Sequence, residues 1–417
     1  MSVLKKKPVK FLFFIFVFFL FLHFILPLII LTTLETPPES SDHFINSYEE
    51  SKSRFLQYEE SLTQTWNDVS HEAYTIEQEA TIDLWWANAN QSKTNLIVLT
   101  SGVHGVEGYV GSAMMDVFLQ DISRQLHAEN TGIVLVHSIN PIGMKEMRRY
   151  NENNVDLNRN FIYDWDSFDK DMNSEYEDLK GFLQPEKPVG NIAWRDAGFY
   201  GEILKTVITD GSAKIEKALL TGQYTQPEGV YYGGNSDEPS TQYVKKLFQN
   251  ILQSEYKNIM LVDLHTGYGP RYQMSIFSSG KETMTQEEAQ EAFHYPLVFT
   301  PDSEEFYTTN GDVPEYFVQL KEDIAPSKNL FATTFEFGTM GDGLLASVDS
   351  VKRTIMENQL AQHGSKNKTS TRILNSRYRE MFYPSELKWR NKAVDDFLQA
   401  FEGILKYNKM IDEKNAQ

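Results

Sequence analysis

The chain has 417 residues, of which 41% are hydrophobic and 23% charged, a composition typical of a globular protein with one large or two ordinary domains. Its formal net charge of −19 argues against nucleic acid and anionic membrane surfaces as ligands. Because the chain contains no cysteine, disulfides, thiolate metal sites and cysteine nucleophiles are excluded.

The N-terminal segment predicts a membrane anchor. Lys5, Lys6, Lys7 and Lys10 precede an apolar run, residues 11–31, that would extend roughly 31 Å as a helix and could cross a bilayer. The lysines favour a cytosolic tail at residues 1–10. No small-residue cleavage site follows, so an uncleaved signal anchor is favoured over a cleaved signal peptide, which would give a secreted protein.

A polar linker containing Pro37 and Pro38 is expected at residues 32–43, and a single domain at residues 44–410. That domain should lie outside the cytosol. Without the four N-terminal lysines, the chain has 35 basic against 58 acidic residues, a charge of −23.

Apolar stretches with strand and helix spacing alternate along the domain. Helical spacing is found at 44–62, 109–126 and 203–220, and strand-like runs at 80–86, 95–100, 132–137 and 258–262. Such alternation predicts an α/β fold with a mixed, mainly parallel central sheet and helices on both faces. Near the C-terminus, residues 348–363 and 383–407 read as amphipathic helices, and Trp389, Phe397 and Phe401 are expected to pack against the sheet.

His104 and Glu107 lie three positions apart in the connection between a predicted strand and the helix that follows it. Such connections, at the carboxyl ends of strands, are where α/β folds place catalytic groups. Both side chains could bind one metal ion, but the pair alone is weak evidence. A zinc site needs a third protein ligand and leaves its fourth position to water.

Two later positions complete the candidate site. His265 directly follows the apolar run 258–262, and Glu336 lies within the strand-like run 333–338. A lone acid in such a run is costly to bury without a partner, which a metal site would supply.

Polar loops connect these elements. Residues 148–161 contain three arginines and five asparagines, a composition suited to binding a carboxylate and stabilising an oxyanion. An acidic, aromatic-rich stretch, Tyr163 to Lys187, is expected to be an insertion or a lid. Another loop contains Tyr231-Tyr232-Gly233-Gly234.

The chemically important residues occur in a characteristic order: His104-x-x-Glu107, Asp156-Leu157-Asn158-Arg159-Asn160-Phe161, His265 and Glu336. This set resembles the zinc carboxypeptidase family typified by carboxypeptidase A. The short sequence motifs around these residues resemble a branch of the family that is catalogued mainly as a domain of unknown function. They are Ser101-Gly102-Val103-His104-Gly105-Val106-Glu107-Gly108, Tyr232-Gly233-Gly234 and Asp263-Leu264-His265-Thr266-Gly267. The resemblance covers roughly residues 45 to 400 and implies the zinc carboxypeptidase fold.

The resemblance also implies a metal centre. His104, Glu107 and His265 match the three ligands of one zinc ion, and two imidazoles with one carboxylate leave the ion enough charge to acidify water. Asp156 matches the carboxylate that orients the first histidine and raises its basicity.

The remaining matches imply roles in binding and catalysis. Asn158 and Arg159 match the pair that grips the terminal carboxylate of the substrate. Arg149 is our choice for the arginine that polarises the scissile carbonyl, although the spacing leaves the adjacent Arg148 open. Glu336 matches the general base that takes a proton from zinc-activated water and returns it to the leaving amine.

Several alternatives stay open at this point. The family carries a mobile tyrosine, for which Tyr316 and Tyr307 are candidates, and the residues of the specificity pocket cannot be assigned. A metallocarboxypeptidase acting on peptides is expected, with a deacylase of N-acyl amino acids similar to aspartoacylase as the first alternative. A non-catalytic, membrane-anchored binding module is the second. A zincin is disfavoured because His71-Glu72 lacks the second histidine of its motif, and no G-x-S-x-G elbow appears.

Overall fold

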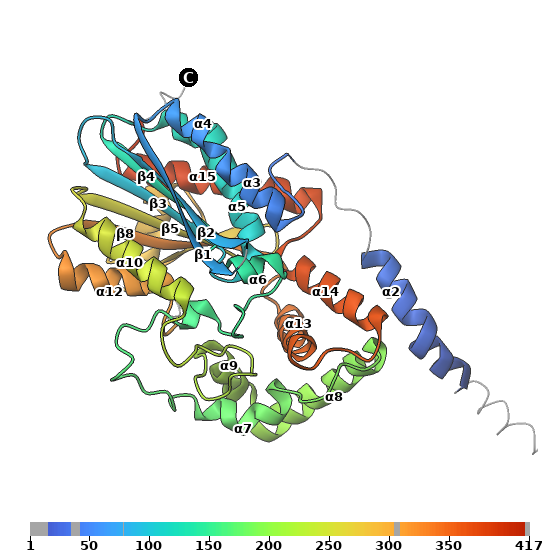
Figure 1. Ribbon diagram of the computed structural model, residues 1–417. Coiled ribbons are helices and arrows are strands. Elements are labelled where there is room, and N and C mark those ends of the chain that lie inside the picture. The colour runs from blue at the N-terminus through green and yellow to red at the C-terminus, as the bar shows by residue number, and fades with distance from the viewer. Residues whose placement is uncertain (1–15, 35–41, 78, 304–308, 413–417) are drawn as a thin grey trace, which may run out of the picture.

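The computed structural model describes residues 16–34, 42–77, 79–303 and 309–412. In this part of the chain, eight strands form one sheet in the order β1-β2-β4-β3-β5-β8-β6-β7 (Figure 1). Their bounds are β1 Asp68–Glu77, β2 Ala80–Asn88, β3 Asn95–Ser101, β4 Thr131–His137, β5 Asn258–Gly267, β6 Met274–Ser278, β7 Val298–Phe299 and β8 Asn329–Gly338.

The centre of the sheet is parallel. Strands β4, β3, β5 and β8 run in one direction, whereas β2 pairs antiparallel with β4 and β6 pairs antiparallel with β8. Every residue of β3 is buried, as expected for a parallel strand that is covered on both faces and therefore has a continuous apolar sequence. The predicted mixed, mainly parallel sheet is confirmed.

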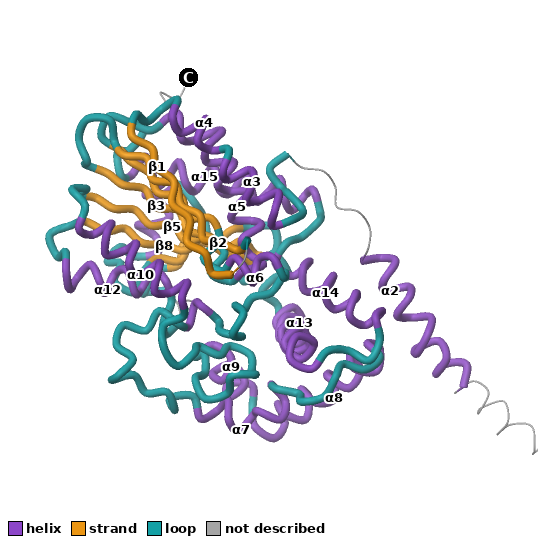
Figure 2. Tube along the Cα trace, in the orientation of Figure 1, coloured by secondary structure: helices purple, strands orange, loops and turns teal. Residues whose placement is uncertain are grey.

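Helices cover both faces of the sheet (Figure 2). The longer ones are α3 Tyr48–Leu56, α5 Gly108–Val117, α7 Ser174–Leu183, α8 Ile192–Asp210, α9 Ser212–Leu220, α10 Pro239–Gln253, α11 Gln286–Phe293, α12 Val313–Ile324, α13 Leu344–His363, α14 Lys368–Phe382 and α15 Leu387–Tyr407. Shorter turns of helix are α4 Tyr58–Thr63, η2 Gly105–Glu107, η3 Phe118–Ile122, η4 Ser123–Gln125, α6 Pro141–Lys145 and η5 Leu157–Arg159.

The alternation of side chains along β3 divides the core into two clusters. Ile97 and Leu99 belong to the cluster that includes α5 and α15, whereas Leu96 and Val98 belong to the cluster that includes α10 and α12. Two hydrophobic layers therefore hold the sheet, and the carboxyl ends of its parallel strands are fixed in position.

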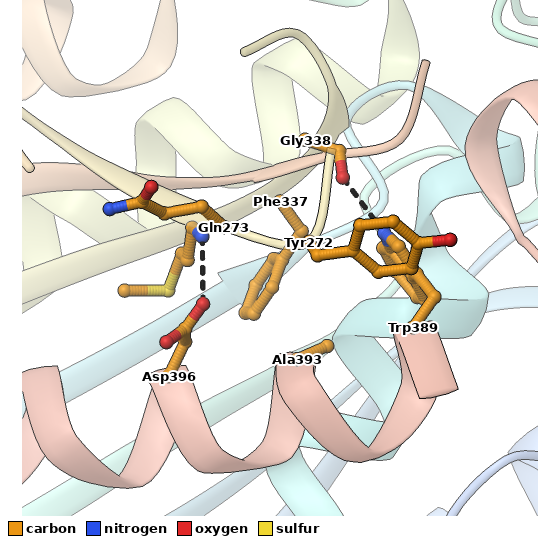
Figure 3. A pocket seen from close by; sticks show the side chains of 8 residues that line it. Tyr272, Gln273, Phe337, Gly338, Trp389, Ala393 and Asp396 are labelled. Atoms are coloured by element: carbon orange, nitrogen blue, oxygen red, sulfur yellow. Dashed lines mark hydrogen bonds between the residues drawn. The ribbon is translucent and has the colours of Figure 1, made fainter. Parts of the chain in front are cut away.

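Helix α15 closes the first of these layers. Trp389 donates from Nε1 to the carbonyl of Gly338, at the end of β8, over 2.8 Å, and Asp396 accepts from the backbone N–H of Met274 over 3.0 Å (Figure 3). The expected packing of Trp389, Phe397 and Phe401 in this core is confirmed. The helix begins at Leu387 rather than at residue 383.

A second group of helices, which we call the helical lobe, consists of α7, α8, α9, α13 and α14 (Figure 1). It has its own buried core, including Phe182, Phe199, Ile215, Ile355 and Ile373. The expected insertion at residues 163–187 contains α7 and is therefore only the first part of a larger structure. The sequence indicated neither the extent of this lobe nor α14.

Among the described residues, one helix is long and apolar enough to span a membrane, at Phe16–Thr33, by length and composition alone. It contains η1 (Phe21–Ile25) and α2 (Leu26–Leu34), so helical structure continues past the expected end of the segment at residue 31. The predicted cytosolic tail at 1–10, the start of the apolar run and most of the predicted linker lie outside the described residues.

Candidate metal centre and active site

Three adjacent parallel strands carry the candidate site at their carboxyl ends. The backbone register pairs Ser101 of β3 with Leu264 of β5, and His265 of β5 with Glu336 of β8. Since the loop after β3 delivers His104 and Glu107, four of the predicted residues meet at one edge of the sheet. This is the edge where open α/β sheets bind their ligands.

Two glycines allow the turn that presents His104. Gly102 has a φ of +67°, and a Cβ there would lie 2.8 Å from Oγ of Ser138. At Gly105 a Cβ would lie 2.2 Å from the backbone carbon of Gly143, so η2 and α6 can approach closely only without a side chain. The tight turn places His104 immediately before η2 and Glu107 at its last position, where the carboxylate of Glu107 contacts His265 and Thr266 of β5.

The three predicted ligands form a compact, buried group. Nδ1 of His104 lies 2.8 Å from Oε1 of Glu107, and Nδ1 of His265 lies 3.2 Å from Oε2 of the same carboxylate. Ligand atoms from all three residues lie within 4.8 Å of one another. Oε2 of Glu107 also accepts from the backbone N–H of Thr266 over 3.0 Å, which fixes the carboxylate in place.

A second carboxylate faces the far side of each imidazole. Nε2 of His104 lies 3.2 Å from Oδ1 of Asp156, and Nε2 of His265 lies 2.8 Å from Oδ2 of Asp263. The other oxygen of Asp263 accepts from the hydroxyl of Thr100 over 2.6 Å. A proton on each Nε2 would face these carboxylates and would leave the Nδ1 lone pairs facing Glu107.

The sequence did not assign Asp263 a role. It lies two residues before His265 on β5, and side chains two apart on a strand share a face. A carboxylate at that spacing before a candidate ligand is the signal that could have identified it.

The donor set fits a metal cation. Two imidazole nitrogens and a carboxylate point at one another, and a cation shared between them would satisfy all three. Burial lowers the pKa of His265, but the carboxylates of Asp263 and Glu107 outweigh burial and raise it well above its ordinary value. For Glu107, burial raises the pKa, but the neighbouring His104 and His265 bring it below its ordinary value. A nitrogen and oxygen set of this kind suits zinc.

Glu336 lies beside the metal-ligand group. Its Oε1 accepts from the backbone N–H of Tyr268 over 2.9 Å, and its partner in the sheet register is His265. Burial and the negative charge of Glu107 raise the pKa of Glu336 to about 8. A divalent cation at the neighbouring ligands would act in the opposite direction and favour the charged carboxylate.

The two adjacent arginines have different partners. Arg149 donates from Nε to Oδ2 of Asp156 over 2.9 Å, and its Nη1 lies 3.7 Å from Oε1 of Glu107. Arg148 instead donates from Nε to Glu357 of α13 over 2.7 Å. Only the side chain of Arg149, of these two, is therefore directed at the metal-ligand group.

Asn158 and Arg159 follow Asp156 in η5. Oδ1 of Asn158 accepts from the backbone N–H of Val313 over 3.1 Å, which leaves its amide N–H groups as possible donors. The guanidinium of Arg159 is buried and donates to the carbonyls of Asn158 and Leu220 over 2.9 and 3.3 Å. Arg159 thus points toward the helical lobe, and its Nε has no hydrogen-bond partner among the described residues.

Tyr231 is a further residue of the site to which the sequence assigned no role. The guanidinium of Arg149 lies over its ring, with the central carbon 5.4 Å from the ring centroid. Tyr231 has a φ of +58°, which a non-glycine residue adopts only when its surroundings hold it there. Its backbone N–H donates to the hydroxyl of Tyr150 over 3.2 Å.

Of the two candidates for the mobile tyrosine, the structure describes Tyr316, and no contact of its side chain with the candidate metal ligands is found there. Tyr316 is buried on α12, where its ring packs against Phe161 and Tyr163 and lies 4.8 Å from Nζ of Lys245. The other candidate, Tyr307, lies outside the described residues.

Residues 44–396, most of the chain, match the family described as "Protein of unknown function (DUF2817)". The chain belongs to this family. The DUF2817 assignment confirms the expected branch catalogued as a domain of unknown function. The search of curated proteins finds no match for the DUF2817 chain.

Solved structures similar to this DUF2817 chain share little sequence with it. A Shewanella amazonensis protein described as a "putative metallopeptidase" is 11% identical over 79% of this chain and 100% of its own, with a TM-score of 0.43. Carboxypeptidase A from Helicoverpa armigera is 13% identical over 84% of this chain and 80% of its own, with a TM-score of 0.42. Succinylglutamate desuccinylase from Chromobacterium violaceum is 14% identical over 75% of each chain, with a TM-score of 0.34. At these values the function has to be inferred from the site itself.

Proposed function

We propose that this protein is a zinc-dependent hydrolase that cleaves an amide bond next to a free carboxylate, in the manner of a metallocarboxypeptidase. One observation carries the proposal. Nδ1 of His104 and Nδ1 of His265 converge on the carboxylate of Glu107, while a separate carboxylate faces each Nε2. Buried histidines oriented in this way are typical of metal ligands rather than of core packing.

His104, Glu107 and His265 would hold one zinc ion. When bound with an open position, zinc acts as a Lewis acid that lowers the pKa of a water molecule and polarises a carbonyl group. Asp156 and Asp263 would keep the two imidazoles in the required tautomer.

Glu336 is proposed as the general base. Its Oε1 is engaged by the N–H of Tyr268, so Oε2 is the oxygen available to a proton. It would take that proton from the attacking water and deliver it to the leaving nitrogen as the amide bond breaks, so that the carboxylate is regenerated. Its position opposite His265 in the sheet register supports this role.

Arg149 and Asn158 are proposed to bind the substrate. With its Nε on Asp156, Arg149 can direct its remaining N–H groups at the carbonyl oxygen, where negative charge develops. Asn158 can donate from its amide to the free carboxylate of the substrate, and Arg159 would add a bidentate contact after exchanging its bond to Leu220.

The N-terminal helix is proposed to be a retained signal anchor that places the domain outside the cytosol. Its apolar length supports this proposal.

The test begins with the metal content of the detergent-solubilised full chain, measured for the native protein and for His265→Ala. About one zinc in the native protein and little in the variant is expected. Peptides with a free C-terminus, the same peptides amidated, and N-acyl amino acids are then compared as substrates, with Glu336→Gln as the inactive control. Cleavage of only the first class supports a carboxypeptidase, and cleavage of only the third class identifies a deacylase. No zinc binding, even after reconstitution, contradicts the hydrolase and favours a binding module.

A further inference from the structure

The C-terminal end of α14 lies against the candidate metal centre. Figure 1 shows this helix running from the side of α2 toward α6 and the neighbouring end of the sheet. Tyr378, Met381 and Phe382, in its last two turns, form a small buried cluster with Val106. Val106 belongs to η2, the turn that ends with the candidate ligand Glu107. The end of α14 therefore packs directly on the turn that carries a predicted metal ligand.

Two threonine hydroxyls bind the same end of α14. The last carbonyl groups of a helix have no partner within the helix, so they need other hydrogen-bond donors when they are buried. Oγ1 of Thr266 donates to the carbonyl of Phe382 over 2.7 Å, and Oγ1 of Thr339 donates to the carbonyl of Met381 over 2.5 Å. Thr266 lies in β5 and Thr339 directly follows β8, so α14 is bonded to the ends of two adjacent strands.

The two threonines differ in their other contacts. The backbone N–H of Thr266 donates to Oε2 of Glu107 over 3.0 Å, and the same oxygen lies 3.2 Å from Nδ1 of His265. The hydroxyl of Thr339 has a second, longer contact of 3.3 Å with the carbonyl of Gly267, which is not a candidate ligand. Of these two threonines, Thr266 is therefore the one that joins α14 to the metal-ligand group.

The backbone of β5 turns immediately after Thr266. Gly267 has a φ of +124°, and a Cβ there would lie 3.0 Å from a ring carbon of Phe382. A side chain at this position would push α14 away from the strand, so the close contact between them depends on the glycine. Because Thr266 is the last residue before the turn, its hydroxyl bond to Phe382 restrains the direction of the N–H that holds Glu107.

We propose that Thr266 positions Glu107 for metal binding, with the C-terminal end of α14 as its support. The proposal rests on the proposed zinc site and deepens it, because it makes one end of the helical lobe a part of the metal centre. The hydroxyl bond restrains the backbone, and the backbone N–H restrains the carboxylate oxygen that faces His265. Thr266 acts through its backbone and is a positioning residue rather than a ligand.

Three single substitutions in the detergent-solubilised full chain test the proposal. Thr266→Val removes the hydroxyl with little change in size, Thr266→Ser keeps the hydroxyl, and Thr339→Val removes the other bond to the same helix end. Zinc affinity is measured by competition with a chelator, and stability by thermal unfolding of the zinc-free protein. We expect zinc affinity to fall by about tenfold in Thr266→Val and to stay near the native value in the other two variants. Both valine variants should unfold at a lower temperature, because each leaves a buried carbonyl without its donor.

The outcomes separate this proposal from the zinc site itself. Equal zinc affinity in the native protein and Thr266→Val would overturn the role of Thr266 and leave the zinc site standing. Equal losses of affinity in the two valine variants would also overturn it, because they would reflect only the stability of the helix end. No zinc binding by the native protein would contradict the zinc site and this proposal together.

Hydrogen exchange in the native protein gives a second test that does not depend on the folding of Thr266→Val. Amide exchange of residues 378–383 is compared with and without zinc, and the last turn of α10 is the control. We expect zinc to slow exchange at 378–383 more than in α10, because the metal and its support stabilise each other. Slower exchange in η2 and β5 without a change at 378–383, or equal slowing in both helices, would overturn the proposal.

Discussion

Oδ2 of Asp263 lies 2.8 Å from Nε2 of His265, two residues away on the same strand. This pair matches the one formed by Asp156 and His104, so each imidazole of the proposed zinc site has a carboxylate behind it. Asp263→Asn keeps the size of the side chain but weakens the hold on the imidazole N–H. We expect metal affinity to fall by about 10- to 100-fold, measured by competition with a chelator.

Thr100→Val is the matched control for that prediction. It removes the hydroxyl bonded to the other oxygen of Asp263 and leaves the contact with His265 intact. The metal affinity of Thr100→Val should fall less than the metal affinity of Asp263→Asn. Equal metal affinity in the native protein and Asp263→Asn would show that the carboxylate does not orient the ligand.

Glu336→Gln should separate metal binding from catalysis. Glu336 lies beside the three ligands but is not one of the residues that converge on the metal position. We expect zinc content to stay near that of the native protein and kcat to fall by about 10²- to 10⁴-fold, the usual contribution of a general base. Substantial hydrolysis by this variant would remove Glu336 from the mechanism.

The two arginines should respond differently to the same substitution. Arg149→Lys replaces the planar guanidinium that is bonded to Asp156. We expect kcat to fall by about 10²- to 10³-fold, because the carbonyl oxygen of the substrate loses a hydrogen-bond donor. Arg148→Lys weakens the bond to Glu357 and should mainly lower the midpoint of thermal unfolding. If only Arg148→Lys lost activity at unchanged stability, the assignment of Arg149 would be wrong.

The ring of Tyr231 should position Arg149. We expect Tyr231→Phe, which keeps the ring, to retain most of the activity, and Tyr231→Leu to lower kcat by about fivefold, since a partly buried cation–π contact contributes about 1 kcal/mol. The KM of either variant should change less than its kcat. An equal loss in Phe and Leu variants would instead indicate a role for the hydroxyl group.

Two glycines should give opposite results when changed to alanine. Gly105→Ala would place a Cβ 2.2 Å from the backbone of Gly143, and we expect it to destabilise the protein by at least ~2 kcal/mol and to lose zinc. At Gly181 in α7, a Cβ meets no atom within 4 Å, so Gly181→Ala should stabilise by about 0.5–1 kcal/mol. Chemical denaturation of both variants tests the pair, and similar stabilities would contradict the close approach of η2 and α6.

The sequence predicted those parts of the molecule that have a local pattern. Buried parallel strands have continuous apolar sequences, so β3, β4 and β5 were found, together with His104 and His265 at their ends. The edge strand β1 was missed because most of its residues are exposed and its sequence has no apolar alternation. Helix α14 was also missed, although its buried residues Ile373, Leu374, Tyr378, Met381 and Phe382 have helical spacing.

Side-chain partners from distant parts of the chain could not be predicted in the same way. The choice between Arg148 and Arg149 depends on Glu357, which lies more than two hundred residues away and pairs with only one of them. The role of Tyr231 depends on a backbone conformation that the sequence does not reveal. Both are consequences of tertiary contacts, whereas the order of the candidate ligands is a property of the chain itself.

The helical segments α7 to α9 enter and leave the sheet domain at neighbouring points. The hydroxyl of Tyr224, just after α9, donates to the carbonyl of Arg159 over 2.8 Å, and Asn160 donates to the carbonyl of Gly233 over 2.8 Å. Because the two ends of this inserted segment lie so close together, the segment can be lengthened, shortened or exchanged without moving the strands that position His104, His265 and Glu336. In evolution, the substrate preference of the protein could therefore change while the reaction was kept. For protein engineering, the same two junctions are the natural places at which to insert a different segment.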